Sequence, residues 1–298
     1  MTESRPDILC IGSALWDIIG RAPVHMRAGS DVAGRITRLP GGVAMNIAMT
    51  LARFGLRPAL LTAIGRDSQG ADLIEAAGTL GISCDYVYRS EDLPTDRYMA
   101  VEGANGLIAA IADAHSLESA GDKILRPLAD GRLGSEKAPW QGLVALDGNL
   151  TVALLSEIAR SPLFARADLR VAPASPGKAE RLMPLMRHPS ATLYVNLEEA
   201  GVLCQTTFES AEEAARGLLA RGARRALVTD GGRPAADGGP DGVLTAAPPS
   251  VMVTRVTGAG DTFMAAHIVA EREGQPPAEA LSRALTAAAR YVSGEAAT

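Results

Sequence analysis

Short apolar runs alternate with stretches of helical spacing along most of the chain. The first run covers residues 7–13 and ends in Gly-Ser, as is typical of a strand buried on both faces. Ile47, Leu51 and Phe54 then follow a helical period, and Gly55 can end that helix in a left-handed conformation. This alternation predicts an α/β fold with a mostly parallel central sheet, helices on both faces and ligands beyond the carboxyl ends of the strands. We expect strands at 7–13, 59–64, 143–146, 169–172, 192–195, 226–229 and 251–254, and helices at 46–54, 211–221 and 261–272.

Two segments depart from this alternation and are typical of hairpins. In residues 97–113, two alternating apolar segments flank Ala104, Asn105 and Gly106, and the Asn-Gly pair favours a type I′ turn. Residues 237–249 are rich in Gly and Pro and predict a second, turn-rich hairpin. The first hairpin interrupts a regular α/β chain, so we expect it to belong to a small β appendage.

Composition adds limits to this picture. The chain has 298 residues, 47% of them hydrophobic, and no Pro/Ser-rich or charge-block linker, which indicates one large domain. The net charge of −5 is spread along the chain and offers no basic surface for nucleic acid or an anionic membrane. Cys10, Cys84 and Cys204 are too scattered for a disulfide framework. The sequence has no apolar stretch long enough to indicate membrane insertion, and its first residues do not indicate export. We therefore expect a cytoplasmic protein that acts on small molecules.

The segment Thr257 to Asp261 carries the strongest chemical signal. Gly258, Ala259 and Gly260 follow a predicted strand and open a predicted helix, so bare N–H groups and the positive end of the helix dipole can bind an oxygen cluster. Asp261, in the first turn, could act as general base on a hydroxyl while the amides stabilise a transferring phosphoryl group. The alternative is a helix cap whose small residues permit tight packing. The segment is not a Walker A loop, because Gly-Lys-Ser/Thr is absent.

This segment resembles the second signature of the ribokinase-like (PfkB) family of carbohydrate and nucleoside kinases. The resemblance marks Asp261 as the catalytic base and the three small residues before it as the anion hole. It extends over nearly the whole chain, because further family motifs occur in the family's order. It implies a single ribokinase-like kinase domain over residues 1–298, with β lid segments at about 14–40 and 92–115, that uses ATP and Mg²⁺. Pairing of lids is common among relatives and implies a homodimer formed through the lid.

The expected acceptor site lies in the first sixth of the chain. Gly12 with Asp17 resembles the family's first substrate-binding element, in which a carboxylate accepts hydrogen bonds from sugar hydroxyls. Gly41 and Gly42, followed by Asn46, resemble the first signature. The glycines allow the backbone to lie against a sugar, and the Asn46 amide can both donate to and accept from hydroxyls. Taken alone, Asp17 reads as a solvated loop acid and Asn46 as an ordinary helix cap.

A second group of motifs is expected to bind the nucleotide. Asn196 and Glu199 match the family's Asn-x-x-Glu element, which organises Mg²⁺ and phosphate through water, and oxygen ligands with retained waters suit this ion. The same pair fits a helix capping box, which is compatible with the family role. Thr229 and Gly231 resemble the Thr-x-Gly nucleotide element, so we expect Thr229, Gly231, Thr257 and Asn196 to contact ATP.

Within the family, the features outside the two signatures are most similar to the pseudouridine kinases. These features are the hairpin at 98–113 and Asp147 to Leu150 followed by Pro173 to Lys178. They imply that Asp113 and Asn149 contact the substrate, and that the reaction converts pseudouridine to pseudouridine 5′-phosphate. The alternatives are a kinase for another nucleoside or for a free sugar of the ribose or fructose type, and a nucleoside-binding sensor without catalysis.

Two residues depart from the pattern of the relatives. Arg255 stands where many relatives have an Asp that helps to hold a monovalent cation, and its positive charge would oppose potassium there. We therefore expect weak or absent potassium activation. Ala172 stands where the pseudouridine kinases usually have Asp before Pro-x-Ser. His267, on the helix that follows Asp261, is expected to be a packing residue.

Overall fold

The computed structural model describes residues 5–27 and 29–295, and its centre is an eight-stranded sheet. The strands are β1 (Ile8–Ile11), β4 (Pro58–Leu61), β9 (Leu143–Asp147), β10 (Asp168–Ala172), β11 (Ala191–Asn196), β12 (Arg225–Asp230), β13 (Arg233–Gly239) and β14 (Gly242–Ala246). Their order is β14-β13-β12-β11-β10-β9-β1-β4, and the six strands from β12 to β4 are parallel. β13 and β14 add an antiparallel edge. The predicted α/β architecture with a mostly parallel central sheet is confirmed.

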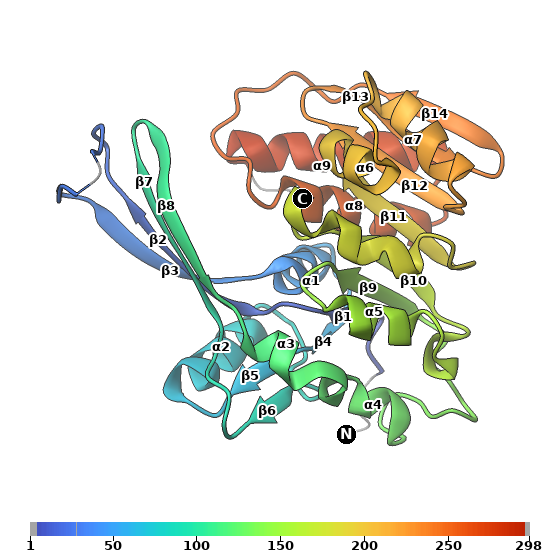
Figure 1. The fold of residues 1–298 in the computed structure, drawn as a ribbon, viewed down its shortest axis with the longest axis horizontal. Helices are drawn as coiled ribbons and strands as arrows, with labels where there is room; N and C mark the ends of the chain where they lie inside the picture. The colour runs from blue at the N-terminus through green and yellow to red at the C-terminus, as the bar shows by residue number, and fades with distance from the viewer. Residues whose placement is uncertain (1–4, 28, 296–298) are drawn as a thin grey trace.

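Helices cover both faces of this sheet and form two apolar cores (Figure 1). The central strands are apolar on both sides, as buried parallel strands require. The helices are α1 (Val43–Arg53), α2 (Ser68–Thr79), α3 (Ser116–Ala120), α4 (Arg126–Ala129), α5 (Val152–Ile158), α6 (Leu197–Cys204), α7 (Ala211–Ala220), α8 (Ala259–Arg272) and α9 (Pro277–Ser293). One core contains the inner faces of α1, α2, α8 and α9, and the other contains those of α3 to α7. None of the helices described is long and apolar enough to cross a membrane.

A second sheet stands away from the main body (Figure 1). It contains β2 (Leu15–Arg21), β3 (Arg35–Gly41), β7 (Arg97–Gly103) and β8 (Gly106–Asp113), in the order β3-β2-β7-β8. A short pair, β5 (Ala63–Gly65) and β6 (Tyr88–Ser90), lies in the main body. Because β2 follows β1 directly and β3 leads into α1, the second sheet is joined to the main body at the carboxyl end of β1.

Two predicted local structures differ from the structure. Residues 251–254 were expected to form a strand, but β14 already occupies that edge of the sheet, and Thr254 donates its N–H to the Val292 carbonyl instead. The hairpin between β7 and β8 turns through Ala104 and Asn105, and only Gly106, at φ 92°, has a positive φ. The turn is therefore a tight turn followed by a left-handed glycine rather than the predicted type I′ turn.

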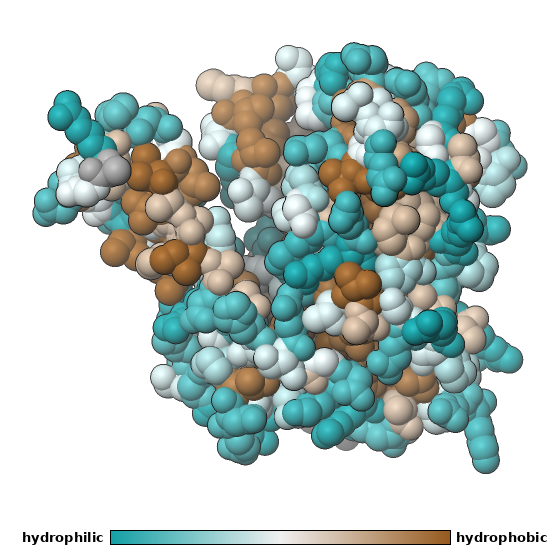
Figure 2. Space-filling view, viewed as in Figure 1, coloured by the Kyte–Doolittle hydropathy of each residue, from teal (hydrophilic) through white to brown (hydrophobic). Residues whose placement is uncertain are grey.

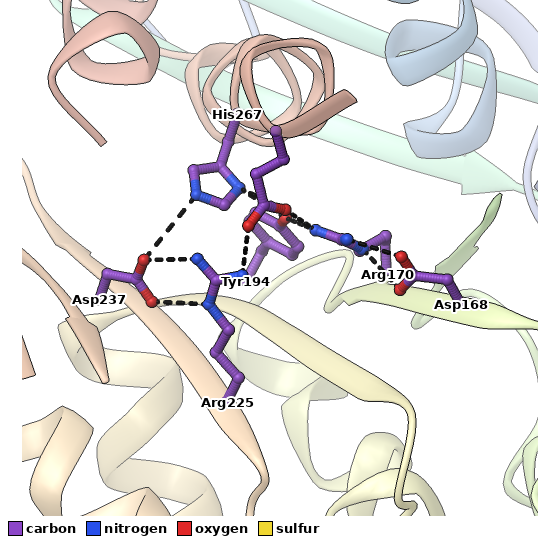
Figure 3. Close-up of polar contacts among 7 residues, drawn as sticks. Asp168, Arg170, Tyr194, Arg225, Asp237 and His267 are labelled. Carbon is purple, nitrogen blue, oxygen red and sulfur yellow. Dashed lines mark hydrogen bonds and ion pairs between the residues drawn. The ribbon is translucent and has the colours of Figure 1, made fainter. Parts of the chain in front are cut away.

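A buried polar cluster joins the carboxyl half of α8 to the sheet (Figure 3). Glu271 forms ion pairs with both Arg170 and Arg225, which come from β10 and β12. Arg170 also pairs with Asp168 at 2.7 Å, and Arg225 pairs with Asp237 at 2.6 Å. Since one carboxylate links two strands to one helix, the cluster fixes where α8 lies on the sheet.

His267 lies inside this cluster, one helical turn before Glu271. Its Nδ1 is 2.9 Å from the Tyr194 hydroxyl, and its ring stacks on Phe263. Burial lowers the pKa of His267 to about 4, so the ring is neutral at pH 7. The side chain is wholly buried and packs within the cluster, as expected for a residue without a catalytic role.

Glu271→Gln tests how strongly this cluster holds α8. The variant leaves the buried Arg170 and the largely buried Arg225 without their shared counter-charge, so we expect a loss of about 3 kcal/mol in the free energy of unfolding. Glu212→Gln is the matched control, because Glu212 pairs with Arg216 at an exposed i,i+4 position on α7 and should cost under about 0.5 kcal/mol. Urea denaturation of both variants measures the difference, and equal effects would show that the cluster does not anchor α8.

Candidate active site

The buried Asp147 carboxylate, at the carboxyl end of β9, organises the acceptor side of the site. Its Oδ2 accepts hydrogen bonds from the Ser13 N–H and hydroxyl, both at 2.8 Å, and from the Ala44 N–H at 3.1 Å. Gly12 is required beside it, because a Cβ there would overlap the carboxylate. Asp147 thus joins the end of β1 to the first turn of α1. Sequence reasoning did not predict Asp147 or Ser13 as site residues, although an Asp that ends an apolar strand was a usable signal.

Asn149 lies next to this junction. Its Nδ2 donates to the Ser13 hydroxyl at 2.8 Å, and its Oδ1 accepts from the Lys178 ammonium at 2.6 Å. The predicted substrate residue therefore belongs to a chain of polar groups that runs from Lys178 to the start of α1. Lys178 itself was not predicted as a site residue, and it brings a positive charge to Asn149.

Asp17 and the glycine pair meet where the two sheets join. Asp17 lies opposite Leu39 in the second sheet, and a Cβ on Gly41 would overlap its carboxylate. Gly42 has φ 92° and packs against the Ser13 backbone, a conformation and a distance that favour glycine. Burial raises the pKa of Asp17 to about 6. The first signature and the Asp17 carboxylate therefore lie side by side.

Asn46 and Asp261 connect the acceptor side to the start of α8. The Asn46 Nδ2 donates to the Asp261 Oδ2 at 3.0 Å across 215 positions of sequence. Burial is the main cause that raises the pKa of Asp261 to about 7, and the hydrogen bond from Asn46 opposes this shift. The negative charges of Asp147, Glu199 and Asp17 raise the pKa further. A carboxyl group with a pKa near 7 is suited to act as a general base at neutral pH.

The first turn of α8 offers free amide groups beside this carboxylate. Gly258 is the N-cap, with φ 89°, and no side chain caps the helix. The first N–H groups of a helix have no partner within the helix, so those of Gly260 and Asp261 remain available to an anion. Of the predicted anion hole of Gly258, Ala259 and Gly260, the Ala259 N–H is already engaged, because it donates to the Val256 carbonyl at 3.1 Å. The Gly258 and Gly260 N–H groups have no backbone acceptor among the described residues.

Asn196 and Glu199 form the capping box that the sequence suggested. The Asn196 Oδ1 accepts from the Glu199 N–H, and the Glu199 Oε2 accepts from the Asn196 N–H, both at 2.8 Å. Burial raises the pKa of Glu199 to about 7. The capping bonds leave the second carboxylate oxygen of Glu199 for other contacts. Within the described residues, no group of three His, Cys, Asp or Glu side chains converges as a metal site.

A cleft of about 1000 Å³ opens at the carboxyl ends of β11 and β12. Its lining includes three predicted nucleotide residues, Asn196, Thr229 and Gly231, and it continues along α6 to Phe208. Gly231 has φ 56°, which turns the chain sharply after β12. The structure therefore brings the Thr-x-Gly element and Asn196 of the Asn-x-x-Glu element to one cleft.

Asp113 is the predicted site residue that the structure places apart from the others. It forms an ion pair with Arg97 at 3.0 Å, and both side chains are partly exposed. Arg97 lies opposite Trp16 in the sheet, and Tyr98 lies opposite Asp17. Because successive side chains point to opposite faces of a strand, Asp113 lies on the face of the second sheet opposite to Asp17.

Comparison with known proteins agrees with this geometry. The model of the pfkB family carbohydrate kinases matches residues 5–298. A pseudouridine kinase of Escherichia coli (strain K12) is 27% identical over 92% of this chain and 86% of its own, and a ribokinase of Bacillus subtilis (strain 168) is 26% identical over 96% and 92%. The structure of Arabidopsis thaliana ribokinase complexed with ribose and ATP has a TM-score of 0.78 at 23% identity, covering 97% of this chain and 93% of that one. This last likeness concerns the fold.

The pH dependence of activity tests the assignment of Asp261. A base with a pKa of about 7 must be ionised, so kcat/KM should rise with pH up to about 7 and level off above it. In Asn46→Ala, the hydrogen bond that lowers this pKa is lost, so the acid limb should move to higher pH. Asn105→Ala, at the far tip of the second sheet, is the control and should leave the limb in place. An unmoved limb in Asn46→Ala would contradict the assignment.

Proposed function

This chain belongs to the pfkB family of carbohydrate kinases, and from this premise we propose that it phosphorylates the 5′-hydroxyl of a nucleoside, with pseudouridine as the preferred acceptor. The coarser activity, that of an ATP-dependent sugar or nucleoside kinase, follows from the family. The observation that carries the proposal is the Asn46–Asp261 contact, because it joins a sugar-binding element to a carboxylate beside free amides. Pseudouridine is favoured by the likeness to a pseudouridine kinase along most of the chain.

The proposed reaction uses two groups of residues. Asp17, Gly41, Gly42 and Asn46 hold the ribose so that its 5′-hydroxyl donates to Asp261. The hydroxyl oxygen attacks the γ-phosphorus of ATP, the bond from that phosphorus to the ADP oxygen breaks, and the hydroxyl proton passes to Asp261. The N–H groups of Gly258 and Gly260, on either side of Ala259, bind the phosphoryl oxygens, on which negative charge is concentrated.

The nucleotide side of the site is proposed to bind ATP with Mg²⁺. Thr229, Gly231, Thr257 and Asn196 would contact the nucleotide. Only one carboxylate oxygen of Glu199 is used in the capping box, so the other is left for a water molecule on a divalent cation. Asn196 and Glu199 would hold Mg²⁺ through water, where it neutralises phosphate charge.

The second sheet, with its flanks at about 14–40 and 92–115, is proposed to act as a lid. The space-filling view shows a hollow between this sheet and the main body (Figure 2). Asp17 lies on the strand that starts at the junction of the two sheets, so a small rotation of the sheet would bring it over the acceptor. Closure would exclude water that could otherwise hydrolyse ATP.

The outer face of this lid is proposed to pair with a second copy of the chain. Ile36 and Ile111 are 80% and 61% exposed, and strand pairing places them with Met99 on the face opposite to Asp17. Exposed apolar patches of this kind mark association surfaces. Light scattering should give the mass of a dimer, and Ile36→Lys with Ile111→Lys should give that of a monomer.

A panel of acceptors, assayed by ADP release, tests the proposed substrate. Pseudouridine should give the highest kcat/KM, above uridine, adenosine, ribose and fructose. If ribose is the best acceptor, the protein is a ribokinase instead. This alternative is supported by the 26% identity to a ribokinase over 96% of the chain. Binding of pseudouridine without ADP release would identify a sensor and refute the kinase proposal.

Asp261→Asn tests the proposed base. The amide cannot accept the proton, so kcat should fall by about 10²-fold or more, while binding of the acceptor is largely retained. The substitution also removes a carboxylate whose pKa is raised by burial and by neighbouring negative charge. Thermal unfolding at pH 8 should therefore show an unchanged or higher Tm, which separates lost chemistry from lost folding. Turnover close to that of the wild type would refute the role of Asp261.

Potassium should have little effect on turnover. The guanidinium of Arg255 lies near the end of α9, and its charge opposes a monovalent cation at this position. Rates in KCl and in tetramethylammonium chloride at equal ionic strength should agree within about twofold. A strong rise with potassium would contradict the expectation.

A further inference from the structure

The loop that leads into α8 is hydrogen-bonded to the carboxyl end of α9. The Val292 carbonyl accepts hydrogen bonds from the Thr254 N–H at 2.8 Å, from the Thr254 hydroxyl at 3.0 Å and from the Arg255 N–H at 3.2 Å. These bonds take the place of the strand expected at residues 251–254. The position of the loop before the anion hole is therefore set by α9, which packs along α8.

Tyr291 extends this attachment to the anion hole itself. Its hydroxyl donates to the Thr257 carbonyl at 3.0 Å. The same hydroxyl lies beside Gly258, where a Cβ would come within 2.5 Å of it. Since the Thr257 carbonyl and the Gly258 N–H belong to one planar peptide unit and point in opposite directions, a bond that fixes the carbonyl also fixes the N–H.

Arg255 contacts both the ring and the backbone of Tyr291. Its guanidinium carbon lies 3.8 Å from the centre of the Tyr291 ring, and its Nε donates to the Tyr291 carbonyl at 2.8 Å. A planar guanidinium can stack on a ring and donate in its own plane at once, whereas an ammonium group cannot. Arg255, Tyr291 and Thr257 thus form a connected unit from the end of α9 to the peptide before Gly258.

We propose that Tyr291, held by Arg255, is a positioning residue for phosphoryl transfer, because its hydroxyl orients the Thr257–Gly258 peptide so that the N–H groups at the start of α8 face the transferring phosphoryl group. This rests on the proposed role of the anion hole. Tyr291 does not touch the reacting atoms. It acts through the direction of the Gly258 N–H, which matters most when charge on the phosphoryl oxygens is greatest. Its effect should therefore appear in kcat more than in the KM of the acceptor.

Tyr291→Phe removes the hydroxyl and keeps the ring under Arg255. We expect kcat to fall about tenfold, with the acceptor KM changed less than about twofold and the acid limb of the pH profile unmoved, because Asp261 is untouched. Tyr88→Phe is the matched control: Tyr88 lies on β6 under Lys123 and Arg126, and its variant should match the wild type. A Tyr291→Phe enzyme with wild-type kcat would overturn the proposal.

Arg255→Met provides the second arm. If Arg255 acts through Tyr291, both substitutions affect the same Thr257 carbonyl. The kcat of the double variant, Tyr291→Phe with Arg255→Met, should therefore be at most about twofold below that of the worse single variant. Independent, multiplicative losses would overturn the connection. Arg255→Lys should resemble Arg255→Met, because Lys cannot both stack and donate as Arg does. Arg216→Met, on α7, controls for the loss of a surface charge.

Failure of the proposed function is distinguishable from failure of this inference. The wild type is first assayed with the acceptor panel, and absence of any kinase activity counts against the function. Binding of ADP by calorimetry then measures the phosphate site without an acceptor. If no acceptor is phosphorylated, weaker ADP binding in Tyr291→Phe at an unchanged Tm supports the positioning role, and unchanged binding refutes it. If an acceptor is phosphorylated, a wild-type kcat in Tyr291→Phe refutes it whatever the ADP binding.

Discussion

The position of α8 on the sheet is the constraint on which the rest of the site depends. At its carboxyl half, Glu271 pairs with Arg170 and Arg225 from two strands, and this cluster is buried under the helix (Figure 3). At its amino end, the helix receives the Asn46 hydrogen bond through Asp261. A buried ion cluster contributes little net stability but fixes geometry, since the paired groups must meet to offset their desolvation. Ion pairs thereby fix the carboxyl half of α8, while backbone N–H groups at its amino end stay free to bind an anion.

Ionised carboxylates buried near the amino end of α8 lower the stability of the folded state, and the rest of the fold offsets this loss. The pKa values of Asp17, Glu199 and Asp261 are all raised, mainly by burial, so these groups hold protons more tightly in the folded state than in the unfolded state. Stability from this source is fully present below about pH 4 and is lost as the pH rises through the folded-state pKa values toward 7. Asp147, by contrast, receives several N–H and O–H donors. One carboxylate therefore builds the site while the other three remain available for chemistry.

The joining of two sheets at the end of β1 explains why so many close backbone approaches occur there. Gly12 meets Asp147, Gly41 meets Asp17, and Gly42 meets the Ser13 backbone. Each contact brings a chain from the second sheet, or the start of α1, within a distance that a side chain would block. The acceptor side is thus assembled by packing at the joint, which is also where a motion of the second sheet would begin.

The sequence by itself determined the local features of this protein. Periodic apolar runs specified the strands and helices, the Asn196 and Glu199 capping box was readable from its spacing, and the small residues before Asp261 predicted an uncapped helix start. These features depend on residues within a few positions of one another, so the sequence contains them directly.

The tertiary structure alone decided what lies far apart in the chain. It placed Asp147 against Ser13 and Tyr291 against Thr257, turned Asp113 to the face opposite Asp17, and left residues 251–254 without a strand because the sheet already ended at β14. It also set the pKa of Asp261, because burial and the charges of distant carboxylates exist only after folding. Contacts across 34 to 215 positions depend on how whole elements pack, and no local pattern of residue types encodes that packing.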